Sequence, residues 1–276
     1  MSVSLIYVYW PNRPAGVSWC DLPFALREAG LAEVLHQAGI DVSEMTLFSE
    51  GDDGEELAAG FKLARDIGKA IDVACEAGNL PIVLCGSCSL AALGVAASGL
   101  GGAGTGVVWC DAHPDLNTPE TSVSGLFEGM ALSAAAGLCW RAMGRELAGT
   151  TPFDLSNVAL FGAREVDAGE AAVIRDAGIP ISGETTQIAE RLAGTASTYL
   201  HLDMDVHNAL TVRANRFAAE GGPSVDEVRD VVRAVPNVGV MAVTGLDPAA
   251  DDAAEAYKIA IDHVKAIVEA QKGAVA

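Results

Sequence analysis

The sequence predicts an α/β protein of three layers, in which helices cover both faces of a central, mostly parallel sheet of eight strands. Short apolar runs alternate along the chain with Ala-, Leu- and Glu-rich stretches of helical periodicity, which is typical of βαβ units. Several runs are almost continuous in Val, Ile and Leu, as expected for strands covered on both faces. No linker or repeat interrupts the 276 residues, so we expect one domain over 1–276.

Eight apolar runs are expected to form the strands, at 3–9, 43–48, 82–86, 106–111, 158–162, 179–181, 198–205 and 238–245. Helices are expected between most of them, over 21–39, 54–78, 129–148, 168–177, 187–194, 223–234 and 252–272. Ligands of such sheets bind outside the carboxyl ends of the strands. The polar residues that follow each apolar run are therefore the candidates for a functional site.

Composition excludes several classes of partner. A formal net charge of −20 repels phosphate backbones, so we expect no nucleic-acid partner. No apolar run reaches the roughly 18 residues of a membrane helix, and the first apolar run lacks the flanks of a signal peptide. The cysteines are scattered and several stand within apolar runs, which favours reduced thiols. We expect a cytoplasmic protein without a membrane partner.

Polar residues gather after two of the predicted strands. Asp111, His113 and Asp115 alternate after the run 106–111, and in extended chain they would share one face. Asp203 and Asp205 alternate in the same way at the end of the run 198–205. Buried carboxylates need a cation, an arginine or water. Together these residues suffice for two divalent ions such as manganese.

Three further residues near these strands are ambiguous. We expect His201 to lie behind the metal ligands and His207 to lie at the surface. Cys88 follows the run 82–86 at a turn from strand to helix. It is either a thiolate ligand or a small buried residue, and its segment alone favours the second interpretation.

Residues 111–125, DAHPDLNTPETSVSG, resemble the Asp-Ala-His-x-Asp motif of the arginase/agmatinase (ureohydrolase) family, with its following Asn-Thr-Pro-Glu-Thr and Ser-Gly. Residues 16–31, FGAREVDAGE at 161–170 and HLDMDV at 201–206 are similar to further family patterns, the last of them to S.D.DV.DP. The resemblance implies an arginase-like fold, a trimer or hexamer of identical chains, and two Mn²⁺ ions per chain. The implied metal ligands are Cys88, Asp111, His113, Asp115, Asp203 and Asp205.

The resemblance also implies an activity. A hydroxide between the metals would attack the guanidino-type carbon of an arginine-like amino acid, and Asp115 would pass its proton to the leaving amine. Asn117, Ser122 and Ser124 would hold the α-carboxylate of this small-molecule substrate. Asp167, with Glu170, would meet its α-amino group. A pocket for the carboxylate favours an amino acid over agmatine.

Three departures from the family pattern change the expected chemistry. Cys88 replaces the first metal-ligand histidine, and soft sulfur prefers zinc or iron to manganese, so one metal position is expected to be weak or to hold another ion. Glu128 replaces a proton-shuttling histidine, and a carboxylate can shuttle protons too, although less well at pH 7 unless its surroundings raise its pKa. Gly245 replaces the glutamate that grips the guanidinium group. In Cys88-Ser89 this chain resembles a branch of the family that hydrolyses N-hydroxy-arginine, whose hydroxyguanidine stays largely neutral, to ornithine and hydroxyurea. The resemblance therefore implies hydrolysis of N-hydroxy-arginine or a related modified arginine.

Two alternatives remain. The chain could hydrolyse another C–N substrate, such as a formimino amino acid, in which case formamide or ammonia would be released. It could also be a metal-poor relative that binds a ligand without catalysis, which the replaced histidines and glutamate favour. The metal content separates the enzyme from the binding protein, and the product separates the two hydrolases.

Overall fold

The computed structural model describes residues 2–10, 19–49, 56–181, 183–250 and 252–275. A single sheet of seven parallel strands runs through them in the order β2-β1-β3-β7-β6-β4-β5. The strands are β1 (Ser2–Tyr9), β2 (Asp41–Phe48), β3 (Asn79–Cys85), β4 (Thr105–Cys110), β5 (Val158–Phe161), β6 (Ser197–Asp203) and β7 (Val238–Thr244). The expected α/β class with a parallel sheet between helices is confirmed, with one strand fewer than predicted.

The missing strand is the run 179–181, which makes only an isolated parallel bridge between Leu160 and Ile181. Pro180 accepts a hydrogen bond from the backbone N–H of Leu160 at 2.9 Å but has no N–H of its own to continue a ladder. Ile181 is also 48% exposed, so it gains little from packing at the sheet edge. An apolar run of three residues containing proline is therefore too short for a strand here.

Ten α-helices lie in the described residues. They are α1 (Leu22–Glu28), α2 (Leu31–Gln37), α3 (Glu56–Glu76), α4 (Cys88–Ala96), α5 (Ala131–Ala135), α6 (Arg141–Met143), α7 (Ala168–Ala177), α8 (Thr185–Arg191), α9 (Val225–Ala234) and α10 (Ala253–Val275). The stretch predicted as one helix over 21–39 divides at Gly30, whose φ of +84° lies in the left-handed region. Residues 54 and 55 of another predicted helix, and 16–18 of the family-like segment, lie outside the described residues.

The predicted helix 129–148 is broken into four short pieces. These are η2 (Glu128–Met130), α5, α6 and η3 (Gly144–Ala148), the last of which is a π-helix. Gly137 and Trp140, between α5 and α6, both have positive φ, at +70° and +51°, and the chain turns there. Gly137 is a residue type that commonly ends helices, whereas Trp140 carries no local turn signal.

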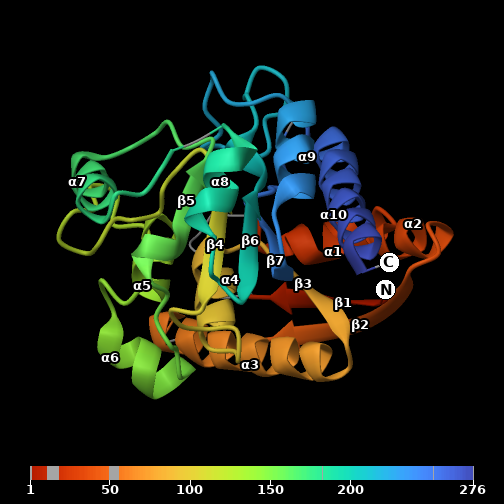
Figure 1. Ribbon diagram of the computed structural model, residues 1–276, viewed down its shortest axis with the longest axis horizontal. Helices are drawn as coiled ribbons and strands as arrows, with labels where there is room; N and C mark the ends of the chain where they lie inside the picture. Colours follow the sequence, from red (N-terminus) through yellow and green to blue (C-terminus); the bar gives the residue numbers. More distant parts are fainter. Residues whose placement is uncertain (1, 11–18, 50–55, 182, 251, 276) are drawn as a thin grey trace.

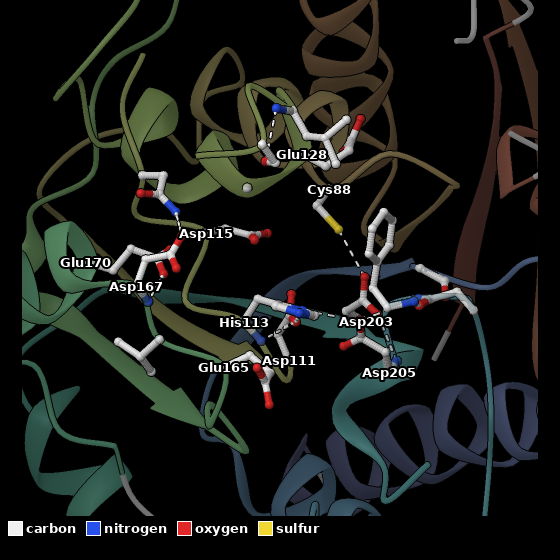
Figure 2. Close-up of a pocket in the computed structure, with 18 of the residues that line it drawn as sticks. Cys88, Asp111, His113, Asp115, Glu128, Glu165, Asp167, Glu170, Asp203 and Asp205 are labelled. Atoms are coloured by element: carbon white, nitrogen blue, oxygen red, sulfur yellow. Dashed lines mark hydrogen bonds and ion pairs between the residues drawn. The ribbon is translucent and has the colours of Figure 1, made fainter. Parts of the chain in front are cut away.

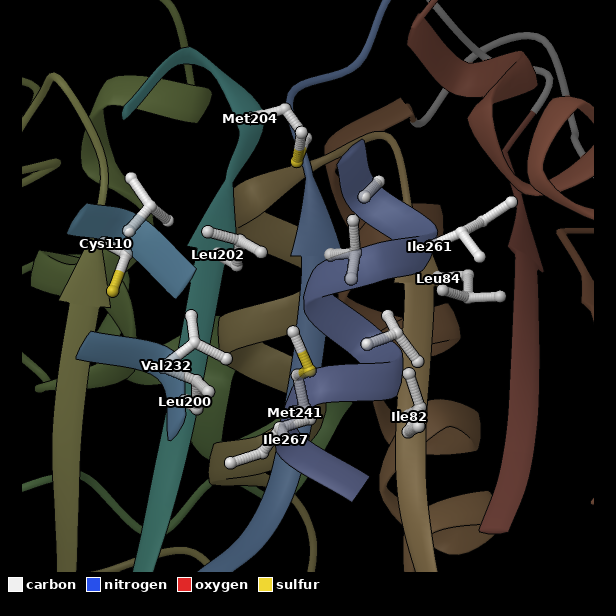
Figure 3. Packing of buried hydrophobic residues seen from close by; sticks show 14 of the residues in the cluster. Ile82, Leu84, Cys110, Leu200, Leu202, Met204, Val232, Met241, Ile261 and Ile267 are labelled. Carbon is white, nitrogen blue, oxygen red and sulfur yellow. The ribbon is translucent and has the colours of Figure 1, made fainter. Parts of the chain in front are cut away.

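Alternation along the strands builds two cores, one on each face of the sheet. Val108 and Cys110 of β4 face a core covered by α1, α2, α8, α9 and α10, whereas Val107 and Trp109 face one covered mainly by α3, α4, α5 and α7. Figure 1 shows the sheet between these two helical layers, and Figure 3 shows Ile261 and Ile267 of α10 against the first face. None of the described helices is both long enough and apolar enough to cross a membrane.

Four neighbouring strands at the centre of the sheet, β3, β7, β6 and β4, end at the same edge. Cys88 begins the helix that follows β3, and Gly245 follows β7 directly. Asp203 is the last residue of β6, and Asp111 follows β4. Because the strands are parallel, these residues from four distant segments meet at one place.

Candidate metal centre

A cavity of about 350 Å³ opens at this edge of the sheet (Figure 2). Its lining includes the six residues expected to hold metal, Cys88, Asp111, His113, Asp115, Asp203 and Asp205. It also includes five of the six other residues expected at the site, Asn117, Ser124, Glu128, Asp167 and Glu170. Ser122 is not among the lining residues; its hydroxyl accepts a hydrogen bond from the Gly125 amide at 2.9 Å and lies 3.4 Å from the Ser124 hydroxyl.

The residues converge through turns. The prediction that they share a face of extended chain was wrong. β4 ends at Cys110, and Asp115 has a φ of +53°, so 111–115 is not extended. β6 likewise ends at Asp203, and η5 (Met204–Val206) follows. The carboxylate of Asp203 accepts the Asp205 amide at 2.7 Å, which holds this turn. Short polar residues commonly hydrogen-bond their own backbone in this way at the end of a strand.

His113 joins two of the buried carboxylates. Its Nδ1 lies 3.3 Å from an oxygen of Asp111 and 3.3 Å from an oxygen of Asp205. Burial lowers the pKa of His113, but hydrogen bonds and the charges of the two carboxylates outweigh burial and raise it. Burial likewise raises the pKa of Asp111, whereas the contacts of Asp205 with His113 outweigh burial and lower the Asp205 pKa. His113 thus contacts both carboxylates through one ring nitrogen.

A second group of contacts surrounds Cys88. Its thiol donates to an oxygen of Asp203 at 3.1 Å and lies 3.3 Å from the Thr244 hydroxyl. Burial, and then the charge of Asp203, raises the pKa of the Cys88 thiol. Asp203 itself is 4% exposed, and burial and the charge of Asp205 raise its pKa. The thiol proton therefore occupies a position that a cation could take.

His201 lies behind this group, as its position in the sequence suggested. It is fully buried, its Nδ1 is 2.7 Å from the Tyr199 hydroxyl, and its Nε2 is 3.1 Å from the Thr244 hydroxyl. Its ring stacks on Trp109 with centroids 3.5 Å apart. Burial lowers the pKa of His201 to about 3, so the imidazole is neutral at neutral pH. A neutral imidazole is the form that binds metal.

The donor set fits divalent cations. Asp111, Asp115, Asp203 and Asp205 are all at least 95% buried, and among the described residues their ion pairs involve only His113. Several buried carboxylates without a lysine or arginine need another positive charge. Two sets of three ligand atoms each lie within 4.8 Å of one another. One set is Asp111, His113 and Asp205, and the other is Cys88, Asp111 and His201.

Glu128 is bound to the start of α4. Its carboxylate accepts the Ser87 hydroxyl at 2.8 Å and the Ser89 amide at 3.2 Å, and Ser87 also caps the helix by accepting the Leu90 amide. Burial raises the pKa of Glu128, and these hydrogen bonds partly oppose it. Since Ser87 and Ser89 flank Cys88, Glu128 fixes the turn that carries the thiol.

On the opposite wall, the side chains expected to bind substrate support one another. Asn117 donates from Nδ2 to Asp167 at 3.0 Å. Both oxygens of Glu170 accept backbone amides, those of Leu116 and Asp167, each at 2.9 Å. Asp167 and Glu170 thus form the capping box of α7. Glu170 holds the wall in place, whereas Asp167 and Asn117 present polar atoms to the cavity.

Comparison with known proteins agrees with this arrangement. A sequence model of the arginase family matches residues 21–268. The chain belongs to the arginase family. It is 32% identical to the arginase of Bacillus caldovelox over 206 residues, which are 66% of this chain and 69% of that protein. The family resemblance expected from the motifs is confirmed, and with it a hydrolase of C–N bonds in linear amidines.

Two further relatives of this arginase-family chain bear on the site. One is the N(omega)-hydroxy-L-arginine amidinohydrolase of Streptomyces lavendulae, 35% identical over 133 residues, which are 47% of this chain and 46% of that protein. The other is the crystal structure of the Bacillus cereus arginase, with a TM-score of 0.83 and 26% identity, covering 97% of this chain and 98% of that one. The fold of the arginase family therefore extends over nearly the whole chain.

The structure adds residues to this arginase-family site that sequence reasoning missed. Asn215 donates to the Gly245 carbonyl at 2.6 Å and to Asp205 at 3.4 Å. Thr244 contacts Cys88, His201 and Asp203 through one hydroxyl. Thr244 could have been found as the last residue of a strand whose carboxyl end faces the site. Asn215 stands in a loop without any such signal.

His207 corrects an expectation. It was expected at the surface but is fully buried, with Nδ1 3.0 Å from the Met204 carbonyl and Nε2 3.0 Å from Nε2 of His263 on α10. The η5 turn ends the extended chain after Asp203, and it directs His207 toward α10.

Proposed function

We propose that this arginase-family protein hydrolyses N-hydroxy-arginine, or a closely related hydroxyguanidino amino acid, to ornithine and hydroxyurea, with manganese among its metals. The observation that supports this proposal is the environment of Gly245. This residue lines the cavity where the family pattern has the glutamate that grips a guanidinium group. Water adds to the guanidino-type carbon and the C–N bond to the ornithine nitrogen breaks.

Gly245 leaves no room for that glutamate. A Cβ atom on Gly245 would lie 1.9 to 2.1 Å from the carboxylate of Asp203, and the φ of +66° is unfavourable for any other residue. The Gly245 carbonyl is also held by Asn215. A carboxylate for a charged guanidinium is therefore excluded at this position. A hydroxyguanidine is less basic and largely neutral, so it loses less by the absence of that charge.

The other residues of the cavity favour an amino-acid substrate. Asn117 and Ser124 offer an amide and a hydroxyl for an α-carboxylate, and Asp167 offers a carboxylate for an α-ammonium group. The likeness to the N(omega)-hydroxy-L-arginine amidinohydrolase of Streptomyces lavendulae, which includes less than half of each chain, supports the same substrate class.

Bound metal ions in such a site make water nucleophilic at neutral pH. The protein contributes orientation and proton transfer. Asp115 is 5% exposed and lines the cavity among the expected metal ligands. We propose that Asp115 delivers a proton to the leaving amine. Asn117 and Asp167 hold the amino-acid end, which places the guanidino-type carbon at the metal ligands.

The experiment is a comparison of substrates on manganese-reconstituted protein. N-hydroxy-arginine, arginine, agmatine and a formimino amino acid are supplied separately, and ornithine, hydroxyurea, urea and formamide are measured by mass spectrometry. We expect hydroxyurea and ornithine in equal amounts, with kcat/KM at least about tenfold above that for arginine, which corresponds to about 1.4 kcal/mol. Asp115→Asn should abolish product, whereas Glu120→Gln, an exposed change, should not. Preference for arginine, or formamide as the product, would reject the assignment.

A further inference from the structure

His201 is a buried imidazole beside the metal ligands, at a position where the quoted family motif has serine. It lies on β6 between β4 and β7, opposite Trp109 on one side and Ala242 on the other. It is fully buried, with 0% of its surface accessible to solvent. Burying an ionisable side chain at the centre of a sheet costs free energy unless polar partners or a bound ion compensate it.

The ring of His201 is held on two sides. Its Nδ1 lies 2.7 Å from the Tyr199 hydroxyl, and the stacked Trp109 fixes the ring plane. Metal-binding histidines usually donate their second ring N–H to a hydrogen-bond acceptor, which fixes the tautomer and the orientation, and the Tyr199 oxygen can take that place. The opposite nitrogen, Nε2, points toward the Thr244 hydroxyl, which also contacts Cys88 and Asp203.

The set of potential ligands that includes His201 differs in chemistry from the other set. A ring nitrogen of His201, the sulfur of Cys88 and an oxygen of Asp111 lie within 4.8 Å of one another. A thiolate, an imidazole and a carboxylate suit zinc, which commonly binds sulfur and nitrogen. The set formed by Asp111, His113 and Asp205 has a single nitrogen and no sulfur, and it suits manganese better.

We propose that Cys88, His201 and Asp111 form a zinc-selective metal position beside a harder, manganese-type position at Asp111, His113 and Asp205. The imidazole that the chain lacks at residue 88, after β3, is supplied from residue 201 on β6, on the other side of β7. This inference rests on the proposed function only in the premise that the cavity binds metal, and its test measures metal binding without substrate.

A purely structural role for His201 makes a different prediction. In that case the imidazole would serve to bind the Tyr199 and Thr244 hydroxyls within the core. Thr244→Val removes one of these hydroxyls and keeps the shape of the side chain. If His201 is a ligand, Thr244→Val should keep most of the zinc affinity, because Cys88 and His201 still bind the ion. His201→Ser should lose most of the zinc affinity.

The test uses full-length protein freed of metal by chelation. Zinc affinity is measured by competition with a chromophoric chelator, and cobalt is used as a spectroscopic probe of sulfur and nitrogen ligands. The variants are His201→Ser, Cys88→Ser and Thr244→Val, with His36→Ser on the exposed face of α2 as the matched control. Circular dichroism establishes that each variant is folded.

We expect His201→Ser to weaken zinc binding by at least about 100-fold, more than the loss typical of a residue behind the ligands. It should weaken the cobalt d–d bands while the sulfur-to-cobalt band remains, and Cys88→Ser should remove that sulfur band. Thr244→Val should change zinc affinity less than His201→Ser, and His36→Ser should leave it unchanged. Zinc affinity and cobalt spectra of His201→Ser equal to those of the unmodified protein would overturn the proposal.

X-ray absorption of zinc provides a measurement on protein that keeps His201. With one equivalent of zinc we expect a sulfur scatterer at about 2.3 Å and an imidazole nitrogen at about 2.0–2.1 Å. In His113→Ala the imidazole signal should persist, since it comes from His201. A zinc ion with sulfur but no imidazole in His113→Ala overturns the zinc position while leaving hydrolysis of N-hydroxy-arginine untouched. Failure to bind any metal overturns both proposals.

Discussion

The thiol of Cys88 donates a hydrogen bond to a carboxylate oxygen of Asp203 across 3.1 Å, which joins the first residue of α4 to the last residue of β6. Figure 2 shows this contact beside the cavity, with the other carboxylates around it. Sulfur thus stands among the carboxylates at a position where the family pattern has an imidazole. We expect the metal preference of the proposed site to depend on this exchange.

Cys88→His should move the metal preference toward manganese. An imidazole is a harder ligand than a thiolate, so the variant should bind manganese at least about tenfold more tightly relative to zinc. Manganese and zinc are measured by elemental analysis after dialysis against both ions. Cys75→Ser is the control, because Cys75 is an exposed thiol on α3. An unchanged manganese-to-zinc ratio in Cys88→His would show that residue 88 is not a ligand.

Gly245→Ala should disrupt the metal site. The added methyl group would occupy the space of the Asp203 carboxylate, so Asp203 must move away from Cys88 and the bound metal. Gly149→Ala is the control, since Gly149 also has positive φ, at +80°, but has no atom within 4 Å of the added methyl group. Both should lose about 1–2 kcal/mol of stability from backbone strain, but only Gly245→Ala should lose metal. Isothermal titration with manganese separates the two.

The same geometry predicts that Gly245→Glu does not create an efficient arginine hydrolase. A glutamate at this position would reach a guanidinium only after Asp203 is displaced. We expect arginine turnover to stay below that of N-hydroxy-arginine in the unmodified protein. Efficient arginine hydrolysis by Gly245→Glu with both metals bound would contradict the steric interpretation.

Glu128→Ala should weaken metal binding through the position of Cys88. Removing the carboxylate frees the Ser87 hydroxyl and the Ser89 amide, so the start of α4 is no longer held. Loss of such support typically costs about 10–100-fold in metal affinity or activity. The pH dependence of kcat in metal-saturated Glu128→Gln then tests the predicted proton-shuttle role of Glu128. If Glu128 is a shuttle, kcat of this variant stays low even at saturating metal. If Glu128 only positions Cys88, saturating metal restores kcat.

His263 should make the protein less stable in acid. Its Nε2 faces His207, its Nδ1 has no hydrogen-bond partner among the described residues, and burial lowers its pKa to about 3. The unfolded chain therefore binds a proton near pH 6.5 that the folded chain does not. Stability contributed by neutral His263 is present above about pH 6.5 and is lost as the pH falls toward 3, by up to about 1.4 kcal/mol per pH unit.

His263→Phe should remove that part of the pH dependence. Urea unfolding of the metal-free protein at pH 7.5, 6.5 and 5.5 gives the free energy of unfolding at each pH. The loss of stability between pH 6.5 and 5.5 should be smaller in His263→Phe than in the unmodified protein. His36→Gln, which alters an exposed histidine, should keep the full slope. Equal slopes in all three proteins would mean that His263 is protonated in the folded state.

The sequence predicted the sheet and the position of its site because both depend on local patterns. Runs of Val, Ile and Leu mark covered strands, and polar residues after them mark the carboxyl edge. Asp111 and Asp203 could be predicted to meet for this reason alone. The turns that deliver Asp115 and Asp205 could not, since a left-handed φ and a 3₁₀ turn leave no clear mark in the sequence.

Contacts across long separations were the least predictable. Asn215 reaches Gly245 from a loop, and His207 reaches His263 from a segment 56 residues away. Such pairs depend on how the helices lie on the sheet, which local periodicity does not determine. The run 179–181 shows the opposite error, because its apolar residues satisfied the strand pattern while Pro180 prevented the ladder.

The place of β7 has a consequence for the biosynthesis of the protein. This strand lies at the middle of the sheet, between β3 and β6, yet it is the last strand to leave the ribosome. Until it inserts, β2-β1-β3 and β6-β4-β5 are separate ribbons, and β3 and β6 expose edges to solvent. Cys88 and Asp203 then belong to different ribbons. From the synthesis of β6 until residues 238–244 insert between β3 and β6, the nascent chain exposes two unpaired strand edges that can aggregate.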